Sequence, residues 1–204
     1  MFRFLAFAFI AAVVGCRHKP PYVEPAPRWR WADVGKVCTP SSPGYPLPDS
    51  LRDASANPFG RGSKKWDDKA KLTQDIPGGF GGIGHREVHP RTIVYLLDTT
   101  KLAEAVPVLV LRGLLPPNPV VAAAQGRFTY SQLYDWLRYI HLHILGVAVA
   151  GWALDDSRNR IFYMLEDEAA AVNIGHRLAE MNAPCFLVAV EITGRIQVLS
   201  GARH

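Results

Sequence analysis

The chain has 204 residues and a mass of 22.5 kDa, with 49% hydrophobic and 20% charged residues, 17 glycines and 16 prolines. This composition excludes a collagen, a long coiled coil and a wholly disordered chain, and the length fits one domain with a tail. The formal net charge is +5, but residues 1–84 hold 12 Lys/Arg against 7 Asp/Glu, whereas residues 85–204 hold 11 of each. Because the expected domain is neutral, we expect no nucleic-acid partner.

Residues 1–15 are typical of a secretory signal peptide. Arg3 supplies a positive charge, residues 4–14 form an unbroken apolar run, and Val13-Val14-Gly15-Cys16 follows. A membrane-spanning helix needs about 20 apolar residues, so this run is too short for one. The alternatives are an uncleaved anchor and a buried core helix.

The end of this segment resembles a bacterial lipobox, in which small residues precede a cysteine that receives lipid before cleavage. The resemblance implies that Cys16 is the first mature residue and anchors the protein to a membrane of the cell envelope through its acyl chains. Arg17 follows in place of the Asp that retains such proteins at the inner membrane. In a source with two membranes, this departure implies the outer membrane.

Residues 16–84 are predicted to be the lipidated cysteine and a flexible tether, because residues 17–84 hold ten of the 16 prolines and nine of the 17 glycines. The tether contains Trp29 and Trp31, which would lie at a headgroup interface, stack on glycan or pack on the domain; we favour packing on the domain.

Residues 79–84 match the glycine spacing of a dinucleotide-binding loop. A proline precedes them and a strand follows, so we interpret them as a hinge.

Residues 85–204 are predicted to form an α+β domain with a mostly antiparallel sheet and helices packed on one face. β-branched and aromatic runs predict strands, and residues 129–132 have the spacing of a capping box before an amphipathic helix. In chain order we expect a strand at 92–98, a helix at 101–113, a short strand at 120–124, a helix at 129–144, strands at 147–154 and 160–165, a helix at 166–182 and a strand at 186–192. The predicted core comprises Leu96, Trp136, Ile140, Val147, Val149, Ile161, Phe162, Leu178 and Val188.

Two cysteines remain besides Cys16, namely Cys38 in the predicted tether and Cys185 in the predicted domain. An exported chain enters an oxidising compartment, so a disulfide between them would join the tether to the domain. The alternative is a buried Cys185 thiol inside the apolar run 184–192, with Cys38 unpaired.

Candidate catalytic and metal-binding residues are scattered. His141 and His143 are two apart and would point away from each other on a helix, while His85 and His89 are flanked by Gly84 and Pro90, which disfavour a helix. Asp155, Ser157, Asn159 and Glu166 have the spacing of a calcium loop, but Arg160 replaces the required glycine. The sequence contains no hydrolase elbow, zinc-protease helix or phosphate loop, so we expect no enzymatic activity, metal or cofactor.

A family resemblance covers residues 78–196. It is carried by Phe80-Gly81-Gly82, by the strand residues 94–99, by residues 125–133 leading to Trp136, and by an Asp-rich turn with Asn159-Arg160-Ile161 before a helix and a strand. This pattern resembles the pro-regions of bacterial alpha-lytic and streptogrisin proteases, α+β modules that template the folding of their protease and then inhibit it. No protease domain follows here, so the resemblance implies a module that acts in trans or has lost that role, and it implies no catalytic residue.

These observations predict a lipid-anchored, exported, non-enzymatic module that binds an envelope or secreted protein. The strand at 186–192 is the candidate partner-binding edge, through Phe186, Val188, Val190 and Ile192, because an edge strand offers backbone groups for strand addition. The alternative is that this apolar strand is central and fully paired. The alternative function is a trans-acting inhibitor or folding helper of a secreted peptidase.

Overall fold

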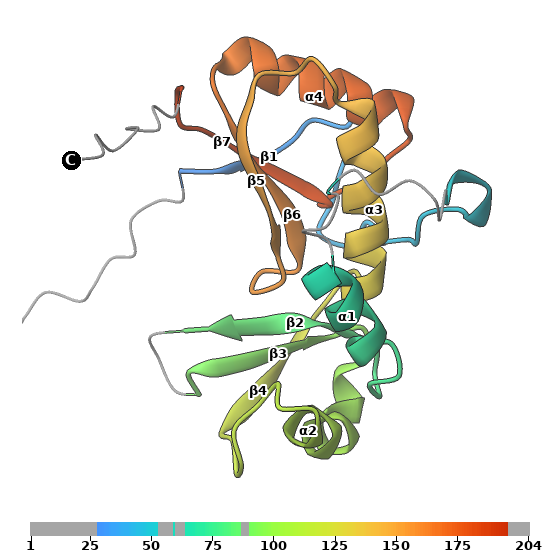
Figure 1. The fold of residues 1–204 in the computed structure, drawn as a ribbon, viewed down its shortest axis with the longest axis vertical. Helices are drawn as coiled ribbons and strands as arrows, with labels where there is room; N and C mark the ends of the chain where they lie inside the picture. Colours follow the sequence, from blue (N-terminus) through green and yellow to red (C-terminus); the bar gives the residue numbers. More distant parts are fainter. Residues whose placement is uncertain (1–27, 53–58, 60–63, 87–89, 196–204) are drawn as a thin grey trace, which may run out of the picture.

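The computed structural model describes residues 28–52, 59, 64–86 and 90–195 of the chain. It contains helices and two mixed β-sheets, which confirms the α+β class (Figure 1). The predicted signal peptide, residues 1–15, and Cys16 lie outside the described residues. In chain order the elements are β1 (Arg30–Trp31), η1 (Asp49–Leu51), α1 (Lys64–Thr73), β2 (Phe80–His85), β3 (Thr92–Leu96), η3 (Thr99–Lys101), α2 (Leu102–Leu111), β4 (Val121–Gln125), α3 (Tyr130–His143), β5 (Val149–Asp155), β6 (Arg160–Leu165), α4 (Glu168–Glu180) and β7 (Val188–Ile192).

The strands form a smaller sheet of order β2-β3-β4 and a larger sheet of order β1-β7-β6-β5. In the smaller sheet β2 and β3 are antiparallel, whereas β3 and β4 are parallel. In the larger sheet β1–β7 and β5–β6 are antiparallel, whereas β6 and β7 are parallel. Both sheets are therefore mixed, and the prediction of one mostly antiparallel sheet is wrong.

The two sheets share one topology, which explains the parallel pairs. Each has a hairpin (β2–β3 or β5–β6), then a helix (α2 or α4), then a third strand beside the second strand of the hairpin. A connection through a helix returns the chain to the same end of the sheet, so the third strand runs parallel to its neighbour. The sequence predicted the helices but not this consequence for strand direction.

Local signals define the helix starts. The Thr129 side chain accepts from the backbone N–H of Gln132, and the Gln132 side chain accepts from the N–H of Thr129, which is the predicted capping box of α3. Asp167 caps α4 by accepting from the N–H of Ala170 at 2.8 Å. Such a cap stabilises a helix by about 1 kcal/mol.

Helix α3 packs against both sheets. Its first residue, Tyr130, belongs to the core of the smaller sheet, whereas the following apolar positions belong to the core of the larger sheet. Figure 1 shows α3 and α4 beside the larger sheet, with α2 beside the smaller one. Of the predicted core residues, Leu96, Trp136, Ile140, Ile161, Leu178 and Val188 are buried, and Val147, Val149 and Phe162 are partly buried.

The folded part of the chain starts well before residue 85. Residues 30–31 form a strand of the larger sheet, and Val34 and Leu47 are buried in its core. Residues 64–73 form α1, and the glycine-rich segment predicted as a hinge forms β2. The predicted boundary between a tether of residues 16–84 and a domain of residues 85–204 is thus wrong for residues 28–52 and 64–84, because long-range packing orders these segments.

Candidate functional site

The strand predicted to bind a partner is not a free edge. β7 lies between β6 and β1, with Val190 opposite Arg30 and Ala189 opposite Trp31, and the N–H of Ala32 donates to the carbonyl of Val188 at 2.9 Å. The chain's own residues 30–32 therefore occupy the position that we expected a partner strand to take.

The four predicted binding residues differ in their surroundings. Val188 and Val190 are buried in the core, and Ile192 is exposed at the end of β7. Phe186 precedes the strand in the left-handed backbone region, with its ring centroid 5.3 Å from that of Trp31. These side chains therefore do not form a common binding surface.

Cys38 and Cys185 are joined as a disulfide, with their Cα atoms 5.6 Å apart. The bridge closes a sequence separation of 147 residues and fixes the segment after β1 to the turn before β7. Tyr45 strengthens the same attachment, because its carbonyl accepts from the Trp136 indole at 3.0 Å and its hydroxyl donates to the carbonyl of Asn182.

The two tryptophans of the predicted tether cover a buried arginine. The Arg160 guanidinium lies 3.8 Å from the Trp29 ring centroid and 5.1 Å from that of Trp31, which is cation–π geometry. Its Nε lies 3.3 Å from Asp155, and burial lowers the pKa of Arg160 despite this partner. The expected packing of both tryptophans on the domain is thus present.

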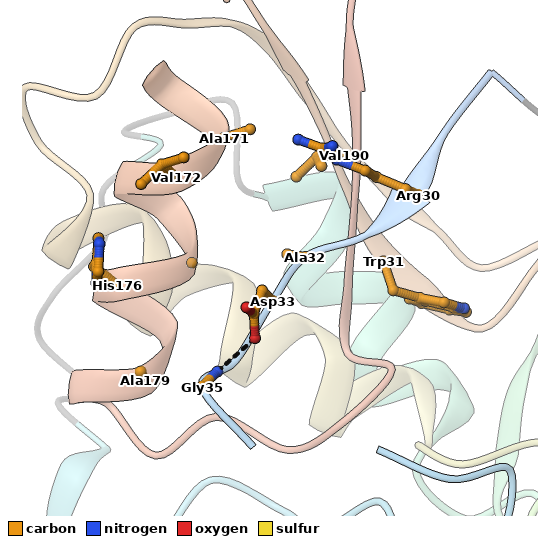
Figure 2. Close-up of a pocket in the computed structure, with 11 residues that line it drawn as sticks. Arg30, Trp31, Ala32, Asp33, Gly35, Ala171, Val172, His176, Ala179 and Val190 are labelled. Atoms are coloured by element: carbon orange, nitrogen blue, oxygen red, sulfur yellow. Dashed lines mark hydrogen bonds between the residues drawn. The ribbon is translucent and has the colours of Figure 1, made fainter. Parts of the chain in front are cut away.

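A groove of about 370 Å³ lies between β1 and α4 (Figure 2). β1 and the segment that follows it form one wall, and α4 forms the other. The charged groups around it have partners: the Arg30 side chain pairs with Glu168, and the Asp33 carboxylate accepts from the N–H of Gly35 at 2.8 Å, drawn as a dashed line in Figure 2. The lining residues comprise Arg30, Trp31, Ala32, Asp33, Gly35, Ala171, Val172, Gly175, His176, Ala179 and Val190.

Small residues on α4 determine how closely the segment after β1 approaches the helix. Ala171, Gly175 and Ala179 are four residues apart and share one face of the helix. A Cβ on Gly175 would lie 2.7 Å from the carbonyl oxygen of Asp33, so a larger residue would push the segment away. The four-residue spacing of these small residues is visible in the sequence. Their role in admitting a neighbouring segment becomes clear only from the position of residues 32–35.

The predicted histidine pairs do not come together. His141 packs among aromatic rings, 4.9 Å from Phe59 and 5.5 Å from Trp152 between centroids, and burial lowers its pKa. The His143 Nδ1–H donates to the carbonyl of Tyr139 in its own helix, His85 is exposed, and His89 lies outside the described residues. In the described part of the chain, no cluster of three His, Cys, Asp or Glu side chains is suited to a metal ion.

The residues with calcium-loop spacing instead form the β5–β6 turn. Ser157 donates to the Asp155 carboxylate, Asn159 is buried, and Asp156 pairs with Lys69 of α1. Lys69 also lies 4.6 Å from the Tyr130 ring centroid. Burial raises the pKa of the Tyr130 hydroxyl. These contacts join the turn to α1 and α3.

Neither a protein-family model nor a curated protein sequence matches the chain at a significant level. Within residues 28–52, 64–86 and 90–195, none of the helices combines the length and the apolar character needed to cross a membrane.

Proposed function

We propose that the protein is an exported, lipid-anchored module without enzymatic activity that binds an extended segment of another envelope or secreted protein. The binding site is the groove between β1 and α4. Cys16 carries the lipid, and in a source with two membranes the anchor is in the outer membrane. The disulfide between Cys38 and Cys185 supports export, because such bonds persist in oxidising compartments.

The observation that carries the binding proposal is the groove itself. β1 is the last strand of the larger sheet on this side among the described residues, and a helix with a small-residue face runs beside it. An extended peptide recognised in such a place gains backbone hydrogen bonds from the strand and places alternate side chains toward the helix. Ala171, Val172 and Ala179 offer apolar contacts, so we expect apolar side chains in the bound segment.

Site-specific photocrosslinking in intact cells tests the binding site. A photoreactive residue replaces Val172, which lines the groove and is 53% exposed, or, as a matched control, Leu145, which is exposed and lies outside the groove. We expect a discrete adduct with one envelope or secreted protein from position 172 and none from position 145. Equal adducts at both positions, or none at position 172, would contradict the proposal. If the captured protein is a secreted peptidase, inhibition assays then test the alternative function.

The anchor has a separate test. Cys16→Ser is expected to leave an unprocessed, unlipidated precursor, whereas the wild-type protein is processed and partitions into detergent through its lipid. Metabolic labelling with a fatty acid reports the lipid directly. A Cys16→Ser protein that is still labelled and processed would overturn the assignment of Cys16.

A further inference from the structure

The strand β4 is a sheet edge without the features that usually prevent edge-to-edge association. Natural proteins protect exposed edges with bulges, charges, prolines or very short strands. β4 has five residues paired in unbroken register with β3, and no strand lies on its other side among the described residues. No charged residue occurs from Gly113 to Gly126.

The other three edges carry such features. β1 has two residues, one of them Arg30. β2 has a register shift between Phe80 and Gly82, and β5 has one between Val149 and Gly151. The carbonyl of Gly81 in β2 also already accepts from Asn159. Among the described strands, β4 is therefore the edge best suited to pair along its whole length with an identical strand, whereas the two-residue β1 offers a partner segment only a few backbone groups beside the wall formed by α4.

The side chains around β4 are small and apolar on both faces. Ala122, Ala123 and Ala124 are half-buried in the isolated chain. Val120, just before the strand, is 70% exposed. This exposed apolar side chain beside an open, uncharged edge is consistent with an interaction surface.

We propose that β4 pairs with β4 of a second copy of the chain, antiparallel about a two-fold axis, and joins two three-stranded sheets into one six-stranded sheet. A two-fold contact brings the same strand of each copy together, so a charge near the axis would face its own copy. β4 is suited to this self-pairing because none of its residues carries a charge that would face its own copy. The excess positive charge of the chain lies in residues 1–84 and not in the β4 segment.

This inference is independent of the proposed binding function, because the β1–α4 groove belongs to the other sheet. The area that a pair of five-residue strands buries is small compared with the ~1,000 Å² of total buried area that a specific interface needs. We therefore expect a reversible dimer whose fraction rises with protein concentration.

Sedimentation equilibrium of the full-length lipidated protein in detergent, over a hundredfold range of concentration, tests the proposal. The wild type is expected to move from the monomer mass to twice that mass. Ala122→Lys is expected to weaken the dimer at least tenfold, because it introduces like charges into the contact. Ala153→Lys, on the exposed part of the bulged β5 edge, is the matched control and should dimerise like the wild type.

A charge swap separates loss of pairing from loss of folding. Ala122→Lys and Ala122→Glu chains are each expected to be monomeric alone and to form a mixed dimer when combined. A wild type that stays monomeric throughout, a Lys variant that dimerises normally, or Lys and Glu variants that do not associate with each other would each overturn the proposal. Photocrosslinking at position 172 reports on the groove separately.

Discussion

The side-chain amide of Asn159 donates to the carbonyl oxygen of Gly81 at 3.1 Å and thereby joins the β5–β6 turn to β2. The same side chain donates to the carbonyl of Phe128 and accepts from the backbone N–H groups of Arg127 and Phe128. Asn159 is buried and has φ 57°, a backbone region that Asn tolerates better than most residues. One residue therefore links both sheets to the start of α3.

Asn159→Asp is expected to reduce the free energy of unfolding by about 2–4 kcal/mol, because a carboxylate oxygen would replace the donor that faces two buried carbonyl oxygens. Urea-induced unfolding followed by tryptophan fluorescence measures the change. Asn173→Asp, the same replacement at an exposed position of α4, is the control and should cost less than about 0.5 kcal/mol. Equal effects of the two substitutions would show that Asn159 does not link the sheets.

Gly81 and Gly84 explain why the sequence predicted a hinge at the position of strand β2. A Cβ on Gly81 would lie 2.6 Å from the carbonyl oxygen of Phe128, and one on Gly84 would lie 2.5 Å from that of Ser157. The glycines of β2 thus allow segments distant in sequence to approach the strand. Glycine has low β-propensity, so the local pattern predicted a hinge where long-range packing produces a strand.

Local signals succeeded where the chain's own neighbours determine the structure. The capping box at Thr129 and Gln132 predicted α3, and the residues of the 155–159 segment predicted the β5–β6 turn. They failed for residues 28–52, whose prolines disfavour regular structure but whose Val34 and Leu47 fill the larger core. The groove was missed for the same reason, since one of its walls comes from this segment.

Removal of the disulfide is expected to destabilise the protein strongly. The bond restricts a 147-residue separation in the unfolded chain, and the chain-entropy estimate for so long a loop is on the order of 5 kcal/mol. Removal of a native disulfide from a small secreted domain typically costs about 2–5 kcal/mol. Cys38→Ser should lower the urea midpoint, and dithiothreitol should lower the wild-type midpoint to a similar value without affecting the variant. Alkylation of both Cys38 and Cys185 in the folded, unreduced wild type would contradict the bridge.

Stability is expected to depend on pH through His141. Burial among aromatic rings lowers the pKa of His141 in the folded state, whereas the unfolded chain has a pKa near ~6.5. Above that value both states are neutral and the contribution is constant. As the pH falls below it, the unfolded state binds the proton more readily, so the free energy of unfolding decreases.

Urea unfolding between pH 7.5 and 5 checks this dependence. His141→Phe should flatten the decrease, because it keeps the aromatic contacts to Phe59 and Trp152 and removes the titrating group. The exposed His85 provides the control, and His85→Phe should keep the wild-type slope. If the free energy of unfolding of the His141→Phe variant depends on pH as steeply as that of the wild type, His141 is not the source of the pH dependence.

The contact between Trp29 and Arg160 is expected to contribute a coupling energy of its own. A desolvated cation–π pair contributes about 2 kcal/mol or more, and the Arg160 side chain is only 5% exposed. A double-mutant cycle of Trp29→Leu and Arg160→Met should therefore give a coupling of about 1–2 kcal/mol in urea unfolding. Trp66 lies on α1 against Phe59 and Trp152, so Trp66→Leu combined with Arg160→Met should be additive. A cycle with no coupling at Trp29 would mean that β1 is held to the sheet by its backbone bonds and apolar packing alone, and that Arg160 is retained for its ion pair with Asp155.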